Sequence, residues 1–466
     1  MTESKRTLDK RSSIAAFAVL ILLIFTKVLL CPLGDLDELW NYALCRSIAM
    51  GYVPYRDFGM VMTPLFTVLF SIPLLVSRTL LMYRLTTAVF FSVTAALYYG
   101  IATKATNRSI GMWLTLMLVF SMDVATYNSM LFLCVLIVFI LLSKKIDGRI
   151  SVSIGAVSAL GILSRQTTGV FLMIAVMLFF IVDRSLRKYF LKVMAGAVAV
   201  LVVFAVCLVA TGSFTDFWDC CLFALLVFSS NAFFDIGTMP YVLLIVAGAV
   251  IDVVMWRKDS NKISLYHLIL GAVLLTVTIP IVDYLHVFSV GCWFIIPVAK
   301  LMSDYLAKYI KPMIVNCVNF LIVVVIMFLS VYGILGTVTD DRFAELRGIP
   351  MHDGYIDGFA VIDGANNDFR AEGNRVVVLS SRACIFSIMD EQVSPRFDVF
   401  LRGTQGTTEP VSIVAEVCGQ DDTIILMPDD YYEENWQNPD GVVEYITNNC
   451  TEIARYGDFA WYSPVS

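Results

Sequence analysis

Charged residues are scarce in this chain. Asp, Glu, Lys and Arg make up 15% of the 466 residues, whereas hydrophobic residues make up 58%. Soluble globular proteins carry more charge, so the composition indicates a multi-pass membrane protein. Metal and redox signatures are also missing, because the 11 cysteines form no CxxC pair and no Cys/His cluster. This spacing argues against a zinc site and against a dithiol redox centre.

Lysine is absent from residues 338–466. This segment holds 23 of the 39 acidic residues and 8 of the 33 basic residues, which gives it a net charge of −15, whereas residues 1–337 carry +9. Basic residues in short loops mark the cytoplasmic side of a membrane protein. We therefore expect a cytoplasmic N-terminus, a transmembrane domain over residues 1–337 and an extracytoplasmic domain over residues 338–466.

Apolar segments long enough to approach a membrane span recur through the first domain, and a span needs about 20 apolar residues. They predict an α-helical polytopic membrane protein with about 11–13 membrane helices. The basic loops between the apolar segments, among them those with Arg84 and Lys144, are expected on the cytoplasmic side. An even number of spans must then separate Arg84 from Lys144, but three apolar segments lie between them. One of the three should then be short or re-entrant, and residues 215–230 should form an interfacial or re-entrant helix. The segments lie near residues 13–31, 61–77, 84–103, 109–122, 128–143, 150–164, 168–183, 189–211, 239–256, 264–282, 286–301 and 313–337.

The C-terminal segment has a different pattern. "NRVVVLSS" (374–381) and "DTIILMP" (422–428) are apolar, strand-like runs that end at turn residues. "DGVVEYITNNC" (440–450) has helical spacing and is followed by strand-like "FAWYS". These features predict a small α/β domain.

The first outer loop, residues 32–60, gathers charge directly after the first span. Helical spacing of its apolar residues predicts a short interfacial helix that starts at Asp37, with Asp37 and Glu38 turned away from lipid and Trp40 at the headgroup level. The following "PYRDF" is expected to be extended because of its proline. Side chains of neighbouring residues point apart in an extended segment, so Arg56 and Asp57 should not pair with each other.

Three motifs in this loop carry a family resemblance: "DELWNY" (37–42), "GYVPYRDF" (51–58) and "TPLF" (63–66). Together they resemble a bacterial subgroup of the GT-C integral-membrane glycosyltransferases, which are similar to protein O-mannosyltransferases and to the enzymes that transfer aminoarabinose to lipid A. "LSRQTTGVF" (163–171) and "PIVDYLHVF" (280–288) extend the resemblance. The chain departs from many relatives at the start of the second span, where "MVMTP" replaces a Lys-containing "KPP".

The resemblance implies an enzyme of the cell envelope that moves a sugar from a polyprenyl-phosphate donor to an acceptor hydroxyl on the outer face of the cell membrane. The acceptor would be a glycan, a lipid or a protein. The enzyme itself would lie in the lipid bilayer, and no nucleic-acid partner is expected. An acceptor hydroxyl needs a general base, and a departing lipid phosphate needs cations or a divalent metal. No cofactor is required with certainty, but Mg²⁺ or Mn²⁺ would suit the phosphate.

The resemblance assigns these roles to individual residues. Asp37 matches the first acid of the family pair and is the expected base, and Asp57 matches the second acidic position. Structural roles stay open for every candidate: Arg165 can snorkel from a helix end, and Asp283 with His286 can cap a helix. The candidates are Asp37, Glu38 and Asp57 for catalysis; Arg56, Arg165 and His286 for the donor phosphate; Asp35, Tyr42, Tyr55, Gln166 and Asp283 in support; and Asp37 with Asp57 for a metal.

Other functions remain open from the sequence. A secondary transporter would explain charges among apolar helices, although no inverted repeat is visible. A polysaccharide polymerase or ligase also has many spans and outer loops. A GT-C-like protein with only a structural role is a further alternative.

Overall fold

The chain forms two compact units that interleave along the sequence. The computed structural model describes residues 3–34, 36–122, 124–224, 233–259, 262–279, 281–306, 311–380, 382–389, 396–398, 400–420, 422–428, 439 and 441–465. The first unit consists of Met1–Cys31, Arg84–Val203 and Ala232–Leu335, and the second of Pro32–Tyr83, Phe204–Asn231 and Gly336–Ser466. The first outer loop thus folds in the same unit as the C-terminal segment.

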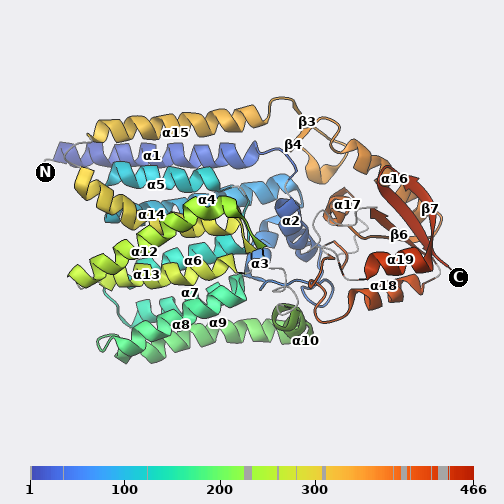
Figure 1. The fold of residues 1–466 in the computed structure, drawn as a ribbon, viewed down its shortest axis with the longest axis horizontal. Coiled ribbons are helices and arrows are strands. Elements are labelled where there is room, and N and C mark those ends of the chain that lie inside the picture. Colours follow the sequence, from blue (N-terminus) through green and yellow to red (C-terminus); the bar gives the residue numbers. More distant parts are fainter. Residues whose placement is uncertain are drawn as a thin grey trace. The chain divides into compact units, whose positions relative to one another are not determined.

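Helices make up almost all of the first unit, and Figure 1 shows them in blue through orange. Its elements, two of which continue into the second unit, are α1 (Glu3–Leu29), α4 (Leu80–Ala105), α5 (Arg108–Ser121), α6 (Tyr127–Leu142), α7 (Gly148–Ser164), α8 (Gln166–Val182), η1 (Arg187–Tyr189), α9 (Phe190–Ala210), β1 (Phe233–Phe234), η3 (Ile236–Thr238), α12 (Met239–Asp259), α13 (Lys262–Leu275), η4 (Thr276–Thr278), β2 (Ile281–Val282), α14 (Tyr284–Leu306) and α15 (Pro312–Gly333).

Each expected apolar segment coincides with a helix, which confirms the predicted helical, multi-pass membrane architecture. Shorter apolar helices of 10–17 residues accompany the long ones, and α5, with 14 residues, is about 21 Å long. In the described part of the chain, the helices long and apolar enough to cross a membrane are Leu80–Ala105, Arg187–Ala210, Ile236–Lys258, His286–Tyr305 and Pro312–Gly333.

The expectation that Arg84 and Lys144 lie on the same side of the membrane is wrong. The buried guanidinium of Arg84 donates to the carbonyl oxygen of Cys31, just beyond the C-terminal end of α1. Lys104, at the other end of α4, lines one cavity with Ser143, which directly precedes Lys144. Arg84 and Lys144 therefore lie at opposite ends of the bundle. An odd number of helices, here three, connects opposite ends of a bundle. The three apolar segments between Arg84 and Lys144 therefore need no short or re-entrant member.

Small residues let the membrane helices approach closely. A Cβ atom at Gly155 of α7 would lie 1.9 Å from the carbonyl oxygen of Val193, and one at Gly196 of α9 would lie 2.1 Å from that of Val152. The backbones of α7 and α9 thus touch, as they do where glycine lines membrane-helix contacts.

The second unit contains an α/β domain. Its four-stranded sheet has the order β5-β6-β8-β7, with β5 parallel to β6 and the other pairs antiparallel. The predicted strands and helix are confirmed as β5, β6, β8 and α19, whereas β7 was not predicted. The unit comprises α2 (Leu36–Ala49), α3 (Leu65–Leu74), α10 (Phe214–Trp218), the π-helical turn η2 (Asp219–Phe223), β3 (Thr337–Thr339), η5 (Ala344–Leu346), β4 (Pro350–His352), α16 (Asp357–Ala371), β5 (Arg375–Val378), α17 (Ala383–Met389), α18 (Pro410–Cys418), β6 (Thr423–Pro428), α19 (Val442–Asn449), β7 (Cys450–Tyr456) and β8 (Phe459–Pro464).

Residues 215–230 begin as the expected helix. They form α10 and the turn η2, while residues 225–230 lie outside the described part of the chain. Asp219 in this turn accepts hydrogen bonds from Thr407, from the backbone N at 3.1 Å and from Oγ1 at 2.6 Å. This segment therefore contacts the C-terminal part of its own unit.

Candidate functional site

Helix α2 places two carboxylates in its first turn. Acidic residues are favourable there because the helix dipole is positive at its N-terminal end. Asp37 is half-buried, whereas Glu38 is only 8% exposed. The backbone oxygen of Asp37 accepts a hydrogen bond from Asn41 Nδ2 at 2.8 Å. Asp35 lies outside the described residues.

The predicted helix exists, but its predicted position in the lipid interface is wrong. Leu39, Tyr42 and Ala43 are all buried. Trp40 packs against the hydrophobic core of the C-terminal α/β domain instead of facing lipid headgroups. The apolar face of α2 is therefore covered by protein, a partner that the periodicity of the helix alone could not reveal.

A buried arginine attaches α2 to the C-terminal domain. Arg46 Nη1 donates to the carbonyl oxygen of Ser387 at 2.8 Å, and Nη2 donates to Glu345 Oε1 at 3.2 Å. The hydroxyl of Ser387 donates in turn to the buried carboxyl of Asp398. Burial raises the pKa of Asp398 to about 7, against the opposing effects of the Ser387 hydroxyl and the Arg46 charge. Sequence reasoning missed this network, because Arg46 lies 341 positions from Ser387 and 299 from Glu345.

The segment "PYRDF" forms a tight turn and not the predicted extended segment. Tyr55 adopts a positive φ of 70°, which reverses the chain. Its backbone N donates to the carbonyl oxygen of Phe58 at 2.9 Å. A positive φ is uncommon for a residue with a side chain, so proline and the surrounding sequence gave no warning of this conformation.

The turn brings Arg56 and Asp57 together, which contradicts the prediction that they would point apart. Arg56 donates from Nε to Oδ1 at 2.8 Å and from Nη2 to Oδ2 at 3.0 Å. The backbone N of Val53 donates to Oδ2 at 2.7 Å, and Arg56 Nη1 donates to the carbonyl oxygen of Thr211 at 3.2 Å. Arg56 holds the pKa of Asp57 below its usual value. Both carboxylate oxygens are thus engaged, and the lowered pKa makes Asp57 a weaker base.

These carboxylates do not form a recognisable metal site. Among the residues that the structure describes, no three His, Cys, Asp or Glu side chains gather closely enough to hold an ion. Asp57 is already paired with a guanidinium. The expected divalent metal stays a prediction, and no step is derived through it.

The two supporting tyrosines are buried and hold the loop in place. The hydroxyl of Tyr42 donates to the carbonyl oxygen of Arg78, and its ring meets that of Tyr83 edge-on with centroids 5.7 Å apart. The hydroxyl of Tyr55 donates to the carbonyl oxygen of Met62 at 2.9 Å. Both hydroxyls are engaged by backbone, which supports a structural role.

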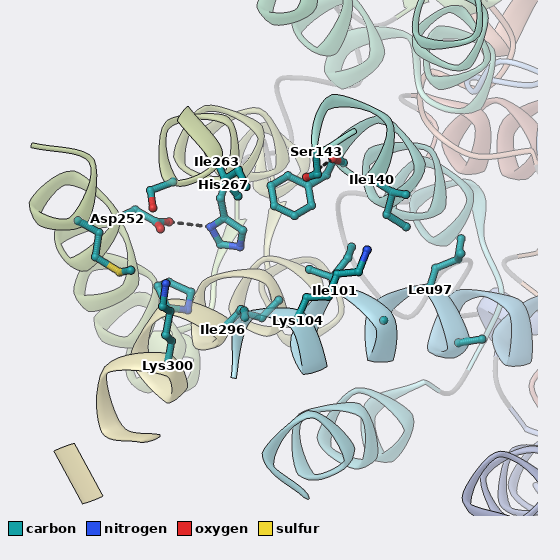
Figure 2. A pocket seen from close by; sticks show the side chains of 17 residues that line it. Leu97, Ile101, Lys104, Ile140, Ser143, Asp252, Ile263, His267, Ile296 and Lys300 are labelled. Carbon is teal, nitrogen blue, oxygen red and sulfur yellow. Dashed lines mark hydrogen bonds and ion pairs between the residues drawn. The ribbon is translucent and has the colours of Figure 1, made fainter. Parts of the chain in front are cut away.

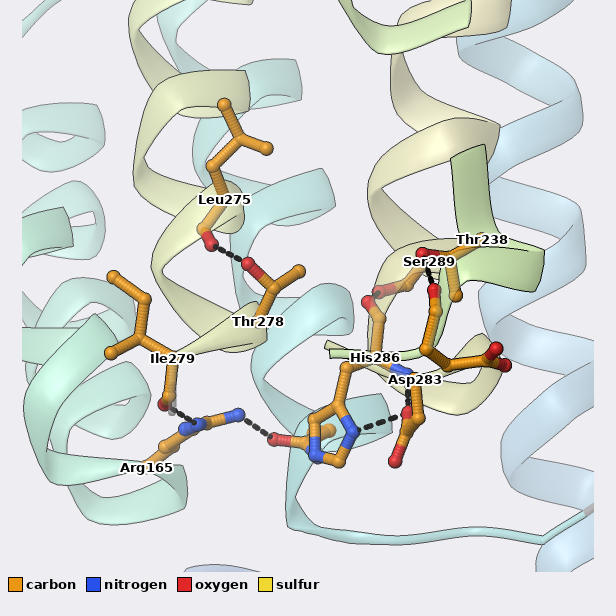
Figure 3. A network of polar contacts seen from close by, with 10 residues as sticks. Arg165, Thr238, Leu275, Thr278, Ile279, Asp283, His286 and Ser289 are labelled. Carbon is orange, nitrogen blue, oxygen red and sulfur yellow. Dashed lines mark hydrogen bonds and ion pairs between the residues drawn. The ribbon is translucent and has the colours of Figure 1, made fainter. Parts of the chain in front are cut away.

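The candidate residues of the first unit meet at one end of its bundle (Figure 3). Arg165 lies between α7 and α8, where it donates from Nη1 to Asn128 Oδ1 at 2.6 Å and from Nη2 to the carbonyl oxygen of Ile279 at 3.1 Å. Its guanidinium also lies 6.0 Å from the centre of the Tyr127 ring. Gln166 follows, buried, as the first residue of α8. Every described partner of Arg165 is electrically neutral, so none of them compensates its charge.

Asp283 and His286 form the contact that their i, i+3 spacing predicts. Asp283 Oδ1 lies 2.6 Å from His286 Nδ1 and accepts from the backbone N of His286 at 2.9 Å. The carboxylate thus fixes the ring orientation at the start of α14. Asn128 lies in the first turn of α6, which Thr126 caps, and its side chain positions Arg165.

The structure brings the candidates together in two groups. Asp37, Glu38, Arg56 and Asp57 belong to the second unit with both tyrosines, and Arg165, Gln166, Asp283 and His286 belong to the first. Their assigned catalytic and binding roles remain predictions.

Known proteins resemble this chain in structure and not in sequence. No protein-family model and no curated protein sequence matches it. ArnT from Cupriavidus metallidurans is similar over 97% of this chain and 98% of its own, with 11% identity and TM-scores of 0.59 in its apo state and 0.55 when bound to undecaprenyl phosphate. The apo oligosaccharyltransferase of Archaeoglobus fulgidus is similar over 90% of this chain and 69% of its own, with 10% identity and a TM-score of 0.51. The chain therefore has the fold of the GT-C membrane glycosyltransferases.

Proposed function

We propose that this chain is a membrane glycosyltransferase that moves a sugar from a polyprenyl-phosphate donor to an acceptor hydroxyl on the outer membrane face, for a cell-surface glycan or glycolipid. One observation carries the proposal: the fold matches ArnT over nearly the full length of both chains, and ArnT has been solved with undecaprenyl phosphate bound. The position of Asp37 directly after the first membrane helix adds support.

Asp37 is the proposed general base. The acceptor oxygen attacks the anomeric carbon of the sugar, the bond from that carbon to the phosphate oxygen breaks, and the lipid phosphate leaves with the bonding electrons. Asp37 takes the proton of the attacking hydroxyl. Of the three candidate acids, Asp37 is half-buried, whereas Glu38 is nearly fully buried and Asp57 is paired with Arg56.

Arg165 is the proposed holder of the departing phosphate. Asn128 and the carbonyl of Ile279 orient its guanidinium without neutralising it, and an arginine can bind a phosphate with two parallel hydrogen bonds. His286 is a second candidate, since Asp283 fixes Nδ1 and leaves Nε2 as the other donor position. Arg56 contributes less to this role, because three of its nitrogens already have partners.

Transfer from purified undecaprenyl-phosphate sugars in proteoliposomes tests the proposal, with release of undecaprenyl phosphate as the readout. A panel of donor sugars and of hydroxyl acceptors extracted from the producing cell identifies the active pair. Asp37→Asn should lower kcat by about 10²–10⁴-fold with little change in the donor KM. Arg165→Gln should raise the donor KM. Asp458→Asn, which removes an exposed carboxylate with no assigned role, is the matched control and should keep the activity.

Two results would count against these assignments. Unchanged kcat in the Asp37→Asn variant would remove the base assignment while leaving the activity in place. Failure of the folded wild-type protein to consume any lipid-phosphate sugar would overturn the function itself, and solute uptake under those conditions would favour a transporter.

A further inference from the structure

The first unit encloses a second candidate site, away from the residues discussed so far. A cavity of about 360 Å³ lies where α4, α6, α12 and α14 end and α13 begins (Figure 2). This volume is within the range of small-molecule sites in proteins. Most of its wall is apolar, and it includes Leu97, Ile101, Phe139, Ile140, Met255 and Ile296.

A fixed histidine faces this cavity. His267 of α13 is 4% exposed, and its Nδ1 lies 2.6 Å from Oδ2 of the buried Asp252 of α12. Its ring stacks on Trp293 with centroids 4.5 Å apart, and Trp293 Nε1 donates to its backbone oxygen at 2.9 Å. Within the described chain, Nε2 of His267 is buried and has no hydrogen-bond partner. An unsatisfied buried polar atom typically costs about 1–3 kcal/mol, so its presence in a cavity wall points to a ligand.

Two lysines give the cavity its positive charge. Lys104 comes from α4 and Lys300 from α14, and both line the cavity (Figure 2). Asp252 is the acidic residue of the lining, and its carboxylate is engaged by His267. An excess of positive charge next to a long apolar wall suits an anionic amphiphile: the head group meets the lysines and the chain meets the wall.

The cavity is distinct from the Arg165 end of the bundle. His286 and Lys300 both lie on α14, 14 positions apart, which corresponds to about 21 Å along the helix. Lys144 follows α6, Lys258 lies in the last turn of α12 and Lys262 begins α13, and all three helices border the cavity. The positive-inside rule assigns such a basic end to the cytoplasm, whose leaflet carries the anionic lipids.

We propose that this cavity binds the phosphate head group of an anionic membrane phospholipid. Lys104 and Lys300 contact the phosphate oxygens, Nε2 of His267 donates to the same group when the imidazole is charged, and an acyl chain lies along the apolar wall. The shared chemistry is a phosphate anion, which could also come from free phosphate, and the experiment separates the two sources. The proposal does not depend on the transferase function.

Lipid titration of the full-length protein in a neutral detergent tests this site, with bound lipid counted by native mass spectrometry. Phosphatidylglycerol should bind at one saturable site at least about tenfold more tightly than phosphatidylcholine, which has the same chain and no net charge. Inorganic phosphate alone should compete only at far higher concentration. The double variant Lys104→Gln/Lys300→Gln should weaken phosphatidylglycerol binding by about tenfold or more.

The control is Lys144→Gln/Lys145→Gln, which removes two exposed lysines near the same end that do not line the cavity. This pair should leave the affinity unchanged. Equal weakening by both double variants, or equal binding of the two lipids, would mean general attraction to the basic end and would overturn the site. Phosphate that competes as strongly as phosphatidylglycerol would overturn the lipid assignment in favour of a soluble anion.

Discussion

Replacement of Asp398 by Asn should change how the stability of the protein depends on pH. The carboxyl is buried and its pKa is about 7, against an ordinary value of 3.8. Between these values the folded state keeps the proton that the unfolded state loses, so the free energy of unfolding falls as pH rises. At 1.36 kcal/mol per pKa unit, the loss reaches about 4 kcal/mol above pH 7 and about 2 kcal/mol at pH 5. An asparagine has nearly the same shape and no such titration.

Thermal unfolding of the detergent-purified protein between pH 5 and pH 8 measures this effect. The Asp398→Asn variant should be more stable than wild type by an amount that grows with pH, and its apparent Tm should vary less across this range. Asp57→Asn is the control, because Arg56 lowers the pKa of Asp57 and this group is ionised in both states throughout the window. Parallel pH profiles for wild type and Asp398→Asn would refute the neutral, buried carboxyl.

Three further perturbations follow from single contacts. Gly59→Ala should destabilise the second unit by about 1–3 kcal/mol, measured as a lower Tm, since its Cβ would lie 2.2 Å from a backbone oxygen in the C-terminal segment. Cys418 and Cys450, with Sγ atoms 3.7 Å apart, should form a disulfide in an oxidising compartment that stabilises the protein by roughly 4 kcal/mol; two free thiols on alkylation of intact cells would contradict an outer location. Asn128→Asp should give Arg165 a carboxylate partner and raise the donor KM about tenfold with the acceptor KM unchanged, and an unchanged donor KM would argue against phosphate binding by this arginine.

Patterns of consecutive residues were sufficient to predict most of the helices and strands. The length and apolar content of the helices are properties of consecutive residues, and so are the strand-like runs that became β5 and β6. Topology was harder, because the position of Arg84 could not be read from its charge. A basic residue at a span end usually marks the cytoplasm, but this guanidinium is buried against the carbonyl of Cys31.

In the candidate site, too, contacts set by sequence neighbours were predictable, whereas contacts that depend on distant residues were not. The spacing of Asp283 and His286 predicted their contact, because i, i+3 residues are neighbours on a helix. The pairing of Arg56 with Asp57 was missed because it depends on the positive φ of Tyr55, and that conformation is stabilised by packing against Phe217 and not by local preference. The partners of Arg46 were invisible for a related reason, since they lie in the C-terminal domain.

The contacts of the first outer loop also determine how a role for the C-terminal segment can be tested. Deletion of residues 345–466 would remove both partners of the buried Arg46, together with the core that covers Trp40. An unpaired buried charge commonly costs about 3–5 kcal/mol, so the helix that carries Asp37 would lose its support. Loss of transfer after such a deletion would therefore not distinguish a substrate-binding lid from a scaffold. A variant confined to the exposed surface of the C-terminal domain, away from these contacts, separates the two: a lid would lose acceptor affinity, whereas a scaffold would keep it.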